Sequence, residues 1–325
     1  MKRKQLWTGI GVCLGMLALI LDSKTALEGA RQGVILCLRT VIPSLFPFFV
    51  LSILLTSSLL GCSLPVLRPL GRLFGLPEGG ESLLIPAFLG GYPVGAQSAA
   101  AAFRNGQLSK AEAERLLSFC SNAGPAFLFG MAGAMFPRRW MAWALWGIHV
   151  SGALYASLLI PGGGSPAVRL AKPRPLSSAD ALNAAVRVMA SVCGWVVLFR
   201  ILLAFLSRWV FWILPAAVQV VATGLLELTN GCCALCAVSD VSARFCICAG
   251  MLALGGLCVA MQTRSVTDGL SLRQYFLGKL LQTVFSVALA ALIAYGSWLP
   301  FGAVVLAVPV IKLQKKGSFS PVFGV

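Results

Sequence analysis

The stretch Leu89-Gly90-Gly91-Tyr92-Pro93-Val94-Gly95 stands in the middle of an apolar segment that runs from Leu83 to Phe103. The arm before it is too short to cross a bilayer, because a helix rises about 1.5 Å per residue and the hydrocarbon core is about 30 Å thick. Glycine and proline in the middle break a helix there. The segment therefore predicts a re-entrant hairpin, in which two short helices joined by a Gly/Pro tip enter and leave the membrane on one side.

Apolar residues dominate the rest of the chain as well, since 58% of its 325 residues are hydrophobic and only 11% are charged. Ordinary globular chains carry about 25% charged residues, and a soluble domain cannot hide so much apolar surface. Spans of roughly 20 residues leave room for about eight to ten membrane segments and no independent soluble domain. We therefore predict an all-α membrane protein whose main partner is the lipid bilayer.

The formal net charge of +16 comes from lysines and arginines scattered in short connections between apolar runs. This distribution follows the positive-inside rule and argues against nucleic acid as a partner. The basic start Met1–Lys4 predicts a cytoplasmic N-terminus, followed by an N-terminal transmembrane helix within residues 1–24. A cleaved signal peptide is the alternative, but no small-residue cleavage site follows Leu21.

A second interrupted segment follows the first hairpin. Ser109-Lys110-Ala111-Glu112 has the spacing of a capping box, which predicts a helix starting at Ser109. That helix runs into an apolar segment in whose middle Asn122-Ala123-Gly124-Pro125 falls. Proline removes a backbone hydrogen bond, so a break in the helix is expected there.

A basic Pro/Gly-rich linker, residues 161–178, divides the chain into two halves that we expect to be related. They are residues 25–160 and 179–298, followed by a short apolar segment and basic tail at 299–325. In the second half, Glu227-Leu228-Thr229-Asn230-Gly231 again separates two apolar arms. Matches between residues 119–124 and 245–250 place a second break at Ala249-Gly250, with Ile247-Cys248 in place of Ser121-Asn122.

The number of crossings orients the two halves. Three crossings and a hairpin in the first half start the second half on the opposite side, so we predict two inverted repeats. Arg138-Arg139 then falls outside, against the positive-inside rule. Inverted repeats whose broken helices meet at the midplane are typical of secondary transporters, with the substrate bound at the breaks.

Backbone that is not hydrogen-bonded at membrane depth is tolerated where it lines a cavity or is buried in protein. The predicted interruptions therefore give the candidate substrate-binding residues. Glycine and proline that merely allow close helix packing are the alternative. The candidates are Gly91, Tyr92, Pro93, Gly95, Asn122, Gly124, Pro125, Glu227, Thr229, Asn230 and Gly231.

Charged side chains inside apolar runs are costly and usually functional. Glu227 is the candidate for cation or proton coupling or for a hydrogen bond to substrate, with a salt bridge to a buried arginine as the alternative. Arg200 is the candidate anion contact. Arg39 and Arg187 lie near span ends, where snorkelling to the interface is expected. The only histidine, His149, is a candidate proton relay or a packed, hydrogen-bonded side chain.

Other chemistries find little support in the sequence. The cluster Cys232, Cys233 and Cys236 has no histidine nearby, so no metal is expected. There is no P-loop, no phosphate-binding glycine motif and no zinc-protease signature, so we expect neither an enzyme nor a cofactor.

Four motifs together resemble the YlbJ-type sporulation integral membrane proteins, which are grouped with the nucleoside-recognition Gate domains and are distantly similar to concentrative nucleoside transporters. The resemblance covers about residues 25–300. The motifs are Ile42-Pro43-Ser44-Leu45-Phe46-Pro47-Phe48, Gly91-Tyr92-Pro93-Val94-Gly95-Ala96, Leu116-Leu117-Ser118-Phe119-Cys120-Ser121-Asn122-Ala123-Gly124-Pro125 and Leu225-Leu226-Glu227-Leu228-Thr229-Asn230-Gly231.

This resemblance implies a protein of the outer forespore membrane that moves dipicolinate, a small aromatic dianion, toward the developing spore. The hairpin tips and broken helices would then hold the substrate. A nucleoside or other small-solute carrier and a non-transporting scaffold for spore assembly stay open as alternatives. A homo-oligomer is also left open.

Overall fold

The structure is a computed structural model that describes residues 2–59, 62, 64–160 and 176–305. Within these residues all regular elements are helices, which confirms the predicted all-α class. Most of the predicted linker (161–175) and the end of the predicted tail (306–325) lie outside the described residues.

Six helical segments of the described chain are long and apolar enough to cross a membrane, which is the property of an integral membrane protein. Shorter apolar helices cover Gln5–Leu21, Gly80–Leu89, Ala216–Leu226 and Leu228–Ala237. The predicted total of membrane segments stays a prediction, because it depends on how these short helices sit in the bilayer. The six long segments are Ser23–Leu59, Lys110–Met135, Arg139–Leu159, Ser178–Trp209, Val241–Val266 and Arg273–Tyr295.

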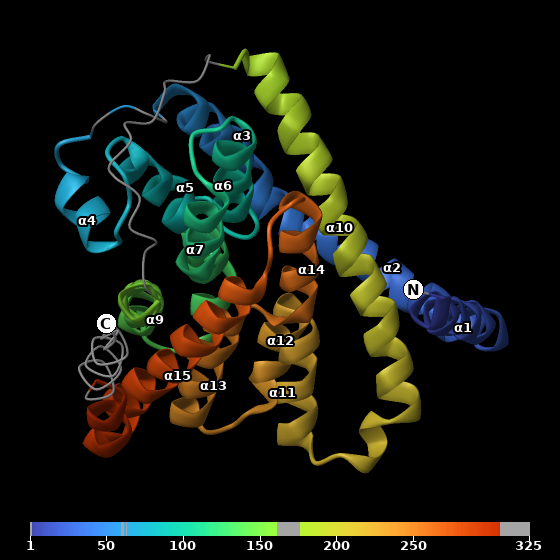
Figure 1. Ribbon diagram of the computed structural model, residues 1–325. Helices are drawn as coiled ribbons and strands as arrows, with labels where there is room; N and C mark the ends of the chain where they lie inside the picture. Colours follow the sequence, from blue (N-terminus) through green and yellow to red (C-terminus); the bar gives the residue numbers. More distant parts are fainter. Residues whose placement is uncertain (1, 60–61, 63, 161–175, 306–325) are drawn as a thin grey trace, which may run out of the picture.

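The first long segment packs against the long helix of the second half. It begins after α1 (Lys2–Leu21) and consists of α2 (Ser23–Leu36), a π-helical turn (Cys37–Val41) and α3 (Ile42–Leu59). Figure 1 shows it crossing α10 (Ser178–Trp209), while α1 projects from the side of the molecule. A Cβ at Gly33 would lie 2.9 Å from the Val197 Cα, so glycine permits this close crossing.

The first hairpin consists of α5 (Leu84–Leu89) and α6 (Val94–Arg104), which follow α4 (Arg68–Leu73) and a 3-10 turn (Gly80–Leu83). The next helix, α7 (Lys110–Cys120), begins with the predicted capping box, in which the Glu112 N–H donates to the Ser109 hydroxyl at 3.3 Å. A return bond from the Ser109 N–H to the Glu112 carboxylate, at 2.8 Å, completes it.

The helix that starts at α7 is broken where the sequence predicts. Ser121 leaves the helix in an extended conformation, and the chain becomes helical again at Pro125 in α8 (Pro125–Phe127). A π-helical turn (Leu128–Ala132), a 3-10 turn (Gly133–Met135) and α9 (Arg139–Leu159) complete this half.

The second half repeats this order of elements. After α10 and a 3-10 turn (Phe211–Ile213), its hairpin is formed by α11 (Ala216–Leu226) and α12 (Leu228–Ala234), which ends in a 3-10 turn (Leu235–Ala237). Its broken helix is α13 (Val241–Leu254) followed by α14 (Gly256–Val266), and α15 (Arg273–Tyr295) comes next. Residues 298–305 are helical as well. That the halves are inverted, and that the hairpins are re-entrant, stays a prediction.

The second break lies at Gly255-Gly256, so the prediction of a break at Ala249-Gly250 was wrong. Ala249 and Gly250 lie inside α13 and are buried. No proline follows them, so nothing removes a helical hydrogen bond there. Gly255 and Gly256 both have φ of +79°, in the left-handed region that glycine enters without steric cost.

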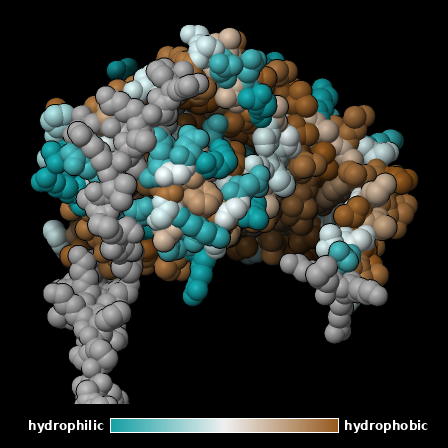
Figure 2. Space-filling view, turned by 45° about the horizontal axis from the view of Figure 1, so that its top comes forward, coloured by the Kyte–Doolittle hydropathy of each residue, from teal (hydrophilic) through white to brown (hydrophobic). Residues whose placement is uncertain are grey.

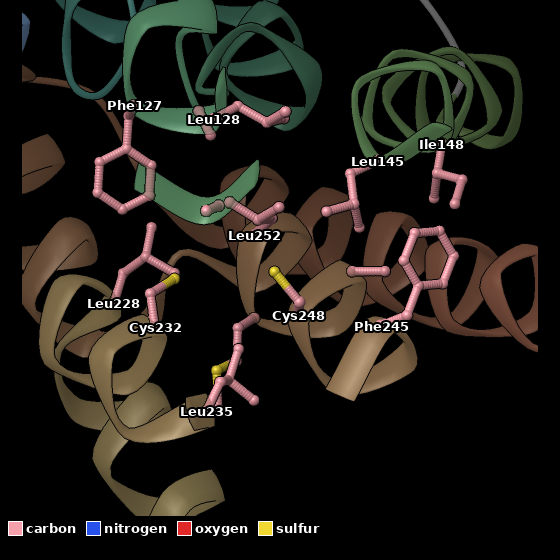
Figure 3. Close-up of a cluster of buried hydrophobic side chains, with 14 of the residues drawn as sticks. Phe127, Leu128, Leu145, Ile148, Leu228, Cys232, Leu235, Phe245, Cys248 and Leu252 are labelled. Atoms are coloured by element: carbon pink, nitrogen blue, oxygen red, sulfur yellow. The ribbon is translucent and has the colours of Figure 1, made fainter. Parts of the chain in front are cut away.

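Buried apolar side chains join the two halves. Figure 3 shows side chains that follow the first break opposite side chains of α12 and α13, in one cluster. The labelled members are Phe127, Leu128, Leu145, Ile148, Leu228, Cys232, Leu235, Phe245, Cys248 and Leu252.

The surface in Figure 2 carries polar residues near the middle of the face, with broad apolar surface to the right of them.

Candidate functional site

Each hairpin meets the break of its own half through glycine. A Cβ at Gly124 would lie 3.0 Å from the Gly91 Cα, so the first tip and the first break touch through their backbones. A Cβ at Gly256 would lie 2.8 Å from the Gly224 carbonyl oxygen, so α11 and the second break touch in the same way. Both halves therefore bring interrupted backbone together in the interior.

A cavity of about 40 Å³ lies where these interruptions converge. Tyr92 from the first tip, Gly124 from the first break, and Glu227 and Thr229 from the second hairpin all line it. Glu227 is the one charged side chain among the lining residues. The other lining residues are Val41, Leu45, Phe127, Val192, Val196, Leu228, Val259 and Gln262.

The Glu227 carboxylate is buried and held by donors of its own turn. It caps α12, accepting from the backbone N–H of Thr229 at 3.0 Å and of Asn230 at 2.7 Å. The Asn230 side-chain amide also donates to it, at 2.6 Å. The ion pairs formed between described residues do not include Glu227. The alternative of a salt bridge to a buried arginine therefore finds no support in the geometry.

Asn122 holds the first break in place. Its side-chain amide donates to the Ala87 carbonyl at 3.1 Å and to the Phe119 carbonyl at 2.7 Å, which links the break to α5 and to the end of α7. Its own oxygen accepts from the Gln282 amide at 3.0 Å. Asn122 is 1% exposed, so these bonds take the place of water.

His149 supports the same break from α9. Its Nε2 accepts from the Ala123 N–H at 3.0 Å, and its carbonyl accepts from the Gln282 amide at 3.0 Å. The structure thus gives His149 the packed, hydrogen-bonded position that was one of its two predicted alternatives. A proton-relay role stays a prediction.

Lys279 is a buried charge near the site that the sequence analysis missed. It is 1% exposed in α15, and its ammonium donates to the Ser121 carbonyl in the first break and, at 2.9 Å, to the Gln282 side chain. It also lies 5.2 Å from the centre of the Tyr92 ring. The available signal was the spacing of Lys279, Gln282 and Ser286, which places three polar side chains on one face of an apolar helix.

Two of the predicted site glycines lie against neighbouring backbone. A Cβ at Gly95 would overlap the Cys120 carbonyl, and a Cβ at Gly231 would overlap the Gly224 Cα. Neither residue lines the cavity, so the packing alternative describes their positions. Pro93 follows a cis peptide bond and precedes α6, while Pro125 begins α8.

The arginines predicted inside spans lie away from the cavity. Arg200 donates to the Gln32 side chain of α2 and is not among the lining residues, so the structure does not bring it to the other candidates. Arg39 and Arg187 are exposed on the helix surface. Among the described residues no group of three His, Cys, Asp or Glu side chains could hold a metal ion, the Cys232 cluster included.

The chain is similar to the sporulation integral membrane protein YlbJ of Bacillus subtilis (strain 168), with 27% identity. The alignment covers 85% of this chain and 80% of that protein. No protein-family model matches the chain, and no solved structure matches it. The predicted resemblance to the YlbJ-type proteins is therefore confirmed, while the Gate-domain grouping stays a prediction.

Proposed function

We propose that this chain is a membrane carrier of a small polar solute, with dipicolinate as the solute to test first. The observation that carries the proposal is the convergence of both hairpins and the first break on one cavity beside the Glu227 carboxylate. A role in sporulation is supported by the similarity to the sporulation integral membrane protein YlbJ of B. subtilis. The outer forespore membrane is the location that the motif resemblance implies.

The size of the cavity supports alternating access. A cavity of roughly 150 Å³ holds a benzene ring, and one water needs about 10–15 Å³. A space of about 40 Å³ therefore admits a few waters and no aromatic solute. The solute is bound only after the tip of the first hairpin or the second hairpin moves. Such a motion exposes the cavity to one side while packed side chains close the other.

The charge of the cavity bears on coupling. A dianion placed beside an ionised Glu227 would be repelled, because like charges at short range disfavour each other. Protonation of Glu227 or entry of a cation removes the repulsion. Glu227 is therefore assigned the coupling role, in which a proton or cation accompanies the anionic solute.

A nucleoside or similar neutral solute is the second candidate. The carboxylate of Glu227, the hydroxyl of Thr229 and the amide of Gln262 line the cavity, and hydroxyl-bearing solutes can hydrogen-bond to all three without adding charge. No catalytic activity is assigned to the chain.

The test compares uptake of labelled dipicolinate and labelled uridine into vesicles that contain only this protein. We expect uptake of dipicolinate by the wild type and its loss in Glu227→Gln, while the variant still inserts and accumulates. Glu78→Gln is the matched control, since Glu78 pairs with Arg68 in a surface ion pair. That control should transport at the wild-type rate.

Other results of the uptake measurement would change the proposal. A normal dipicolinate rate in Glu227→Gln removes the coupling role from this residue. If the wild type prefers uridine, a nucleoside replaces dipicolinate as the proposed solute. Transport of neither solute, together with tolerance of Glu227 and Asn122 substitutions in sporulating cells, favours a membrane scaffold for spore assembly.

A further inference from the structure

Lys279 is a buried cation without a carboxylate partner. The ion pairs between described residues do not include it, and its ammonium is bonded to a carbonyl and an amide oxygen. A buried charge is costly unless it is paired, and charges retained inside membrane segments usually serve binding or transport. The structure therefore leaves Lys279 without its natural counter-ion.

Buried hydroxyl groups lie near Lys279. The hydroxyls of Ser121 and Tyr275 are buried, and neither bonds to a carboxylate or a backbone carbonyl of a described residue. Ser121 is the residue whose carbonyl receives the Lys279 ammonium, and Tyr275 lies one helical turn before Lys279 on the same face of α15. The hydroxyls of Tyr275, Ser121 and Thr263 lie near one another. A buried ammonium beside a group of hydroxyls that can turn their donors outward matches a ligand that only accepts hydrogen bonds, as a carboxylate does.

Tyr92 contacts both this group and the cavity. Its ring lines the cavity that contains Glu227, and the Lys279 ammonium lies 5.2 Å from the same ring. The Tyr92 hydroxyl donates to the Leu252 carbonyl at 2.6 Å, next to the second break. A movement of the first hairpin tip that carries Tyr92 away from Leu252 would therefore join the cavity to Lys279.

We propose that Lys279, with the hydroxyls of Ser121 and Tyr275, forms a carboxylate-binding subsite beside Tyr92 that takes one carboxylate of the transported solute. The inference rests on the proposed carrier function and names the chemistry that this site selects. Glu227 and Lys279 then have separate tasks. Glu227 couples transport to a cation or proton, and Lys279 recognises the anionic group of the solute.

The test measures binding of dipicolinate and of its neutral diamide to the full chain in nanodiscs. We expect Lys279→Gln to weaken dipicolinate binding by about tenfold or more, because it removes a charge-assisted hydrogen bond. Binding of the diamide should stay within about twofold of the wild type, since the diamide has no carboxylate for the ammonium to hold. Lys279→Arg should keep part of the preference for the dianion. Lys110→Gln is the matched control, because Lys110 is an exposed lysine paired with Glu114.

If Lys279→Gln does not accumulate, two milder variants can be measured in its place. Ser121→Ala and Tyr275→Phe each remove one hydroxyl donor, and each should weaken dipicolinate binding by a few fold with no change for the diamide. An equal loss for both ligands, or no loss for either, overturns the subsite. Displacement of dipicolinate by inorganic phosphate at equal affinity overturns its assignment to carboxylates.

The carrier function and the subsite fail in different ways. A wild type that binds uridine and not dipicolinate keeps the carrier function and loses the subsite. A wild type that binds none of the three solutes loses both.

Discussion

The two broken helices use different means to interrupt the same kind of segment. At the first break, Ser121 and Gly124 are extended. The Asn122 side chain bonds the Phe119 carbonyl and His149 bonds the Ala123 N–H, so side chains take over backbone groups that the helix no longer pairs. At the second break, Gly255 and Gly256 turn the chain through two left-handed conformations. The first interruption depends on hydrogen-bonding side chains and the second on the absence of side chains.

The two breaks also differ in the groups that surround them. The first break collects the polar groups, and its charge comes from Lys279 in α15 of the other half. The second break adds backbone close to Tyr92, since a Cβ at Gly255 would lie 3.4 Å from the Tyr92 ring. Both buried charges near the cavity, Glu227 and Lys279, belong to the second half, whereas Tyr92, which lines the cavity and lies near Lys279, belongs to the first. A site of this kind cannot be assembled from one half alone.

The largest loss of unfolding free energy is expected for a substitution at the first break. Asn122→Ala removes the side-chain donor of the Ala87 and Phe119 carbonyls and one of the two acceptors of the Gln282 amide. Each unpaired buried group costs about 1–3 kcal/mol, so a loss of about 3–5 kcal/mol in unfolding free energy is expected. Denaturant unfolding in detergent measures it, with the exposed Asn183→Ala as control. A loss as small as that of the control would mean that the first break does not depend on its side chains.

A smaller loss is expected at the second break. Gly256→Ala places a Cβ 2.8 Å from the Gly224 carbonyl oxygen in a left-handed conformation, and we expect a loss of about 2–3 kcal/mol. Gly106→Ala is the control, because Gly106 has φ of +69° and open space around its Cβ position. That control should lose about 1 kcal/mol from the conformation alone. Equal losses at Gly256 and Gly106 would show that the contact between α11 and the second break is dispensable.

The smallest effect on stability is expected at the start of α13, the helix that leads to the second break. The Asp240 carboxylate accepts from the N–H groups of Ser242 and Ala243 and from the Tyr295 hydroxyl. The Ser242 N–H, followed by the Tyr295 hydroxyl, holds the pKa of Asp240 below its ordinary value. A group with a lowered folded pKa stabilises the fold above its unfolded pKa, so this contribution is lost as the pH falls through the lowered pKa.

Hydrogen exchange at Ser242 and Ala243 reports this loss. Exchange of these amides, corrected for the intrinsic pH dependence, should speed up as the solution becomes acidic below the ordinary Asp pKa of about 3.9. Asp240→Asn keeps a capping oxygen and should abolish the pH dependence. A pH dependence that persists in Asp240→Asn would assign it to another group.

Local signals in the sequence predicted the all-α class, the capping box at Ser109 and the first break. Each rests on residues that act within a few positions of one another. Proline at 125 removes a helical hydrogen bond wherever the helix packs, and Ser109 and Glu112 cap the same turn. Tyr92, Gly124, Glu227 and Thr229 line one cavity, and the substrate-binding role of the predicted site residues stays a prediction.

The parts that the sequence did not predict depend on tertiary contacts. The similarity of residues 245–250 to 119–124 did not locate the second break, because that break depends on φ at Gly255 and Gly256. Lys279 lies only two turns from the start of α15, where a lysine ordinarily reaches the membrane interface. The approach of Ser121 and Tyr92, which buries it, comes from segments far away in the chain.

The small cavity between the hairpins has a consequence for the cell that makes this protein. A space of about 40 Å³ lined by Leu45, Phe127 and Leu228 has room for only a few waters. For the proposed carrier, so small a space between transport cycles would limit the leakage of ions across the membrane.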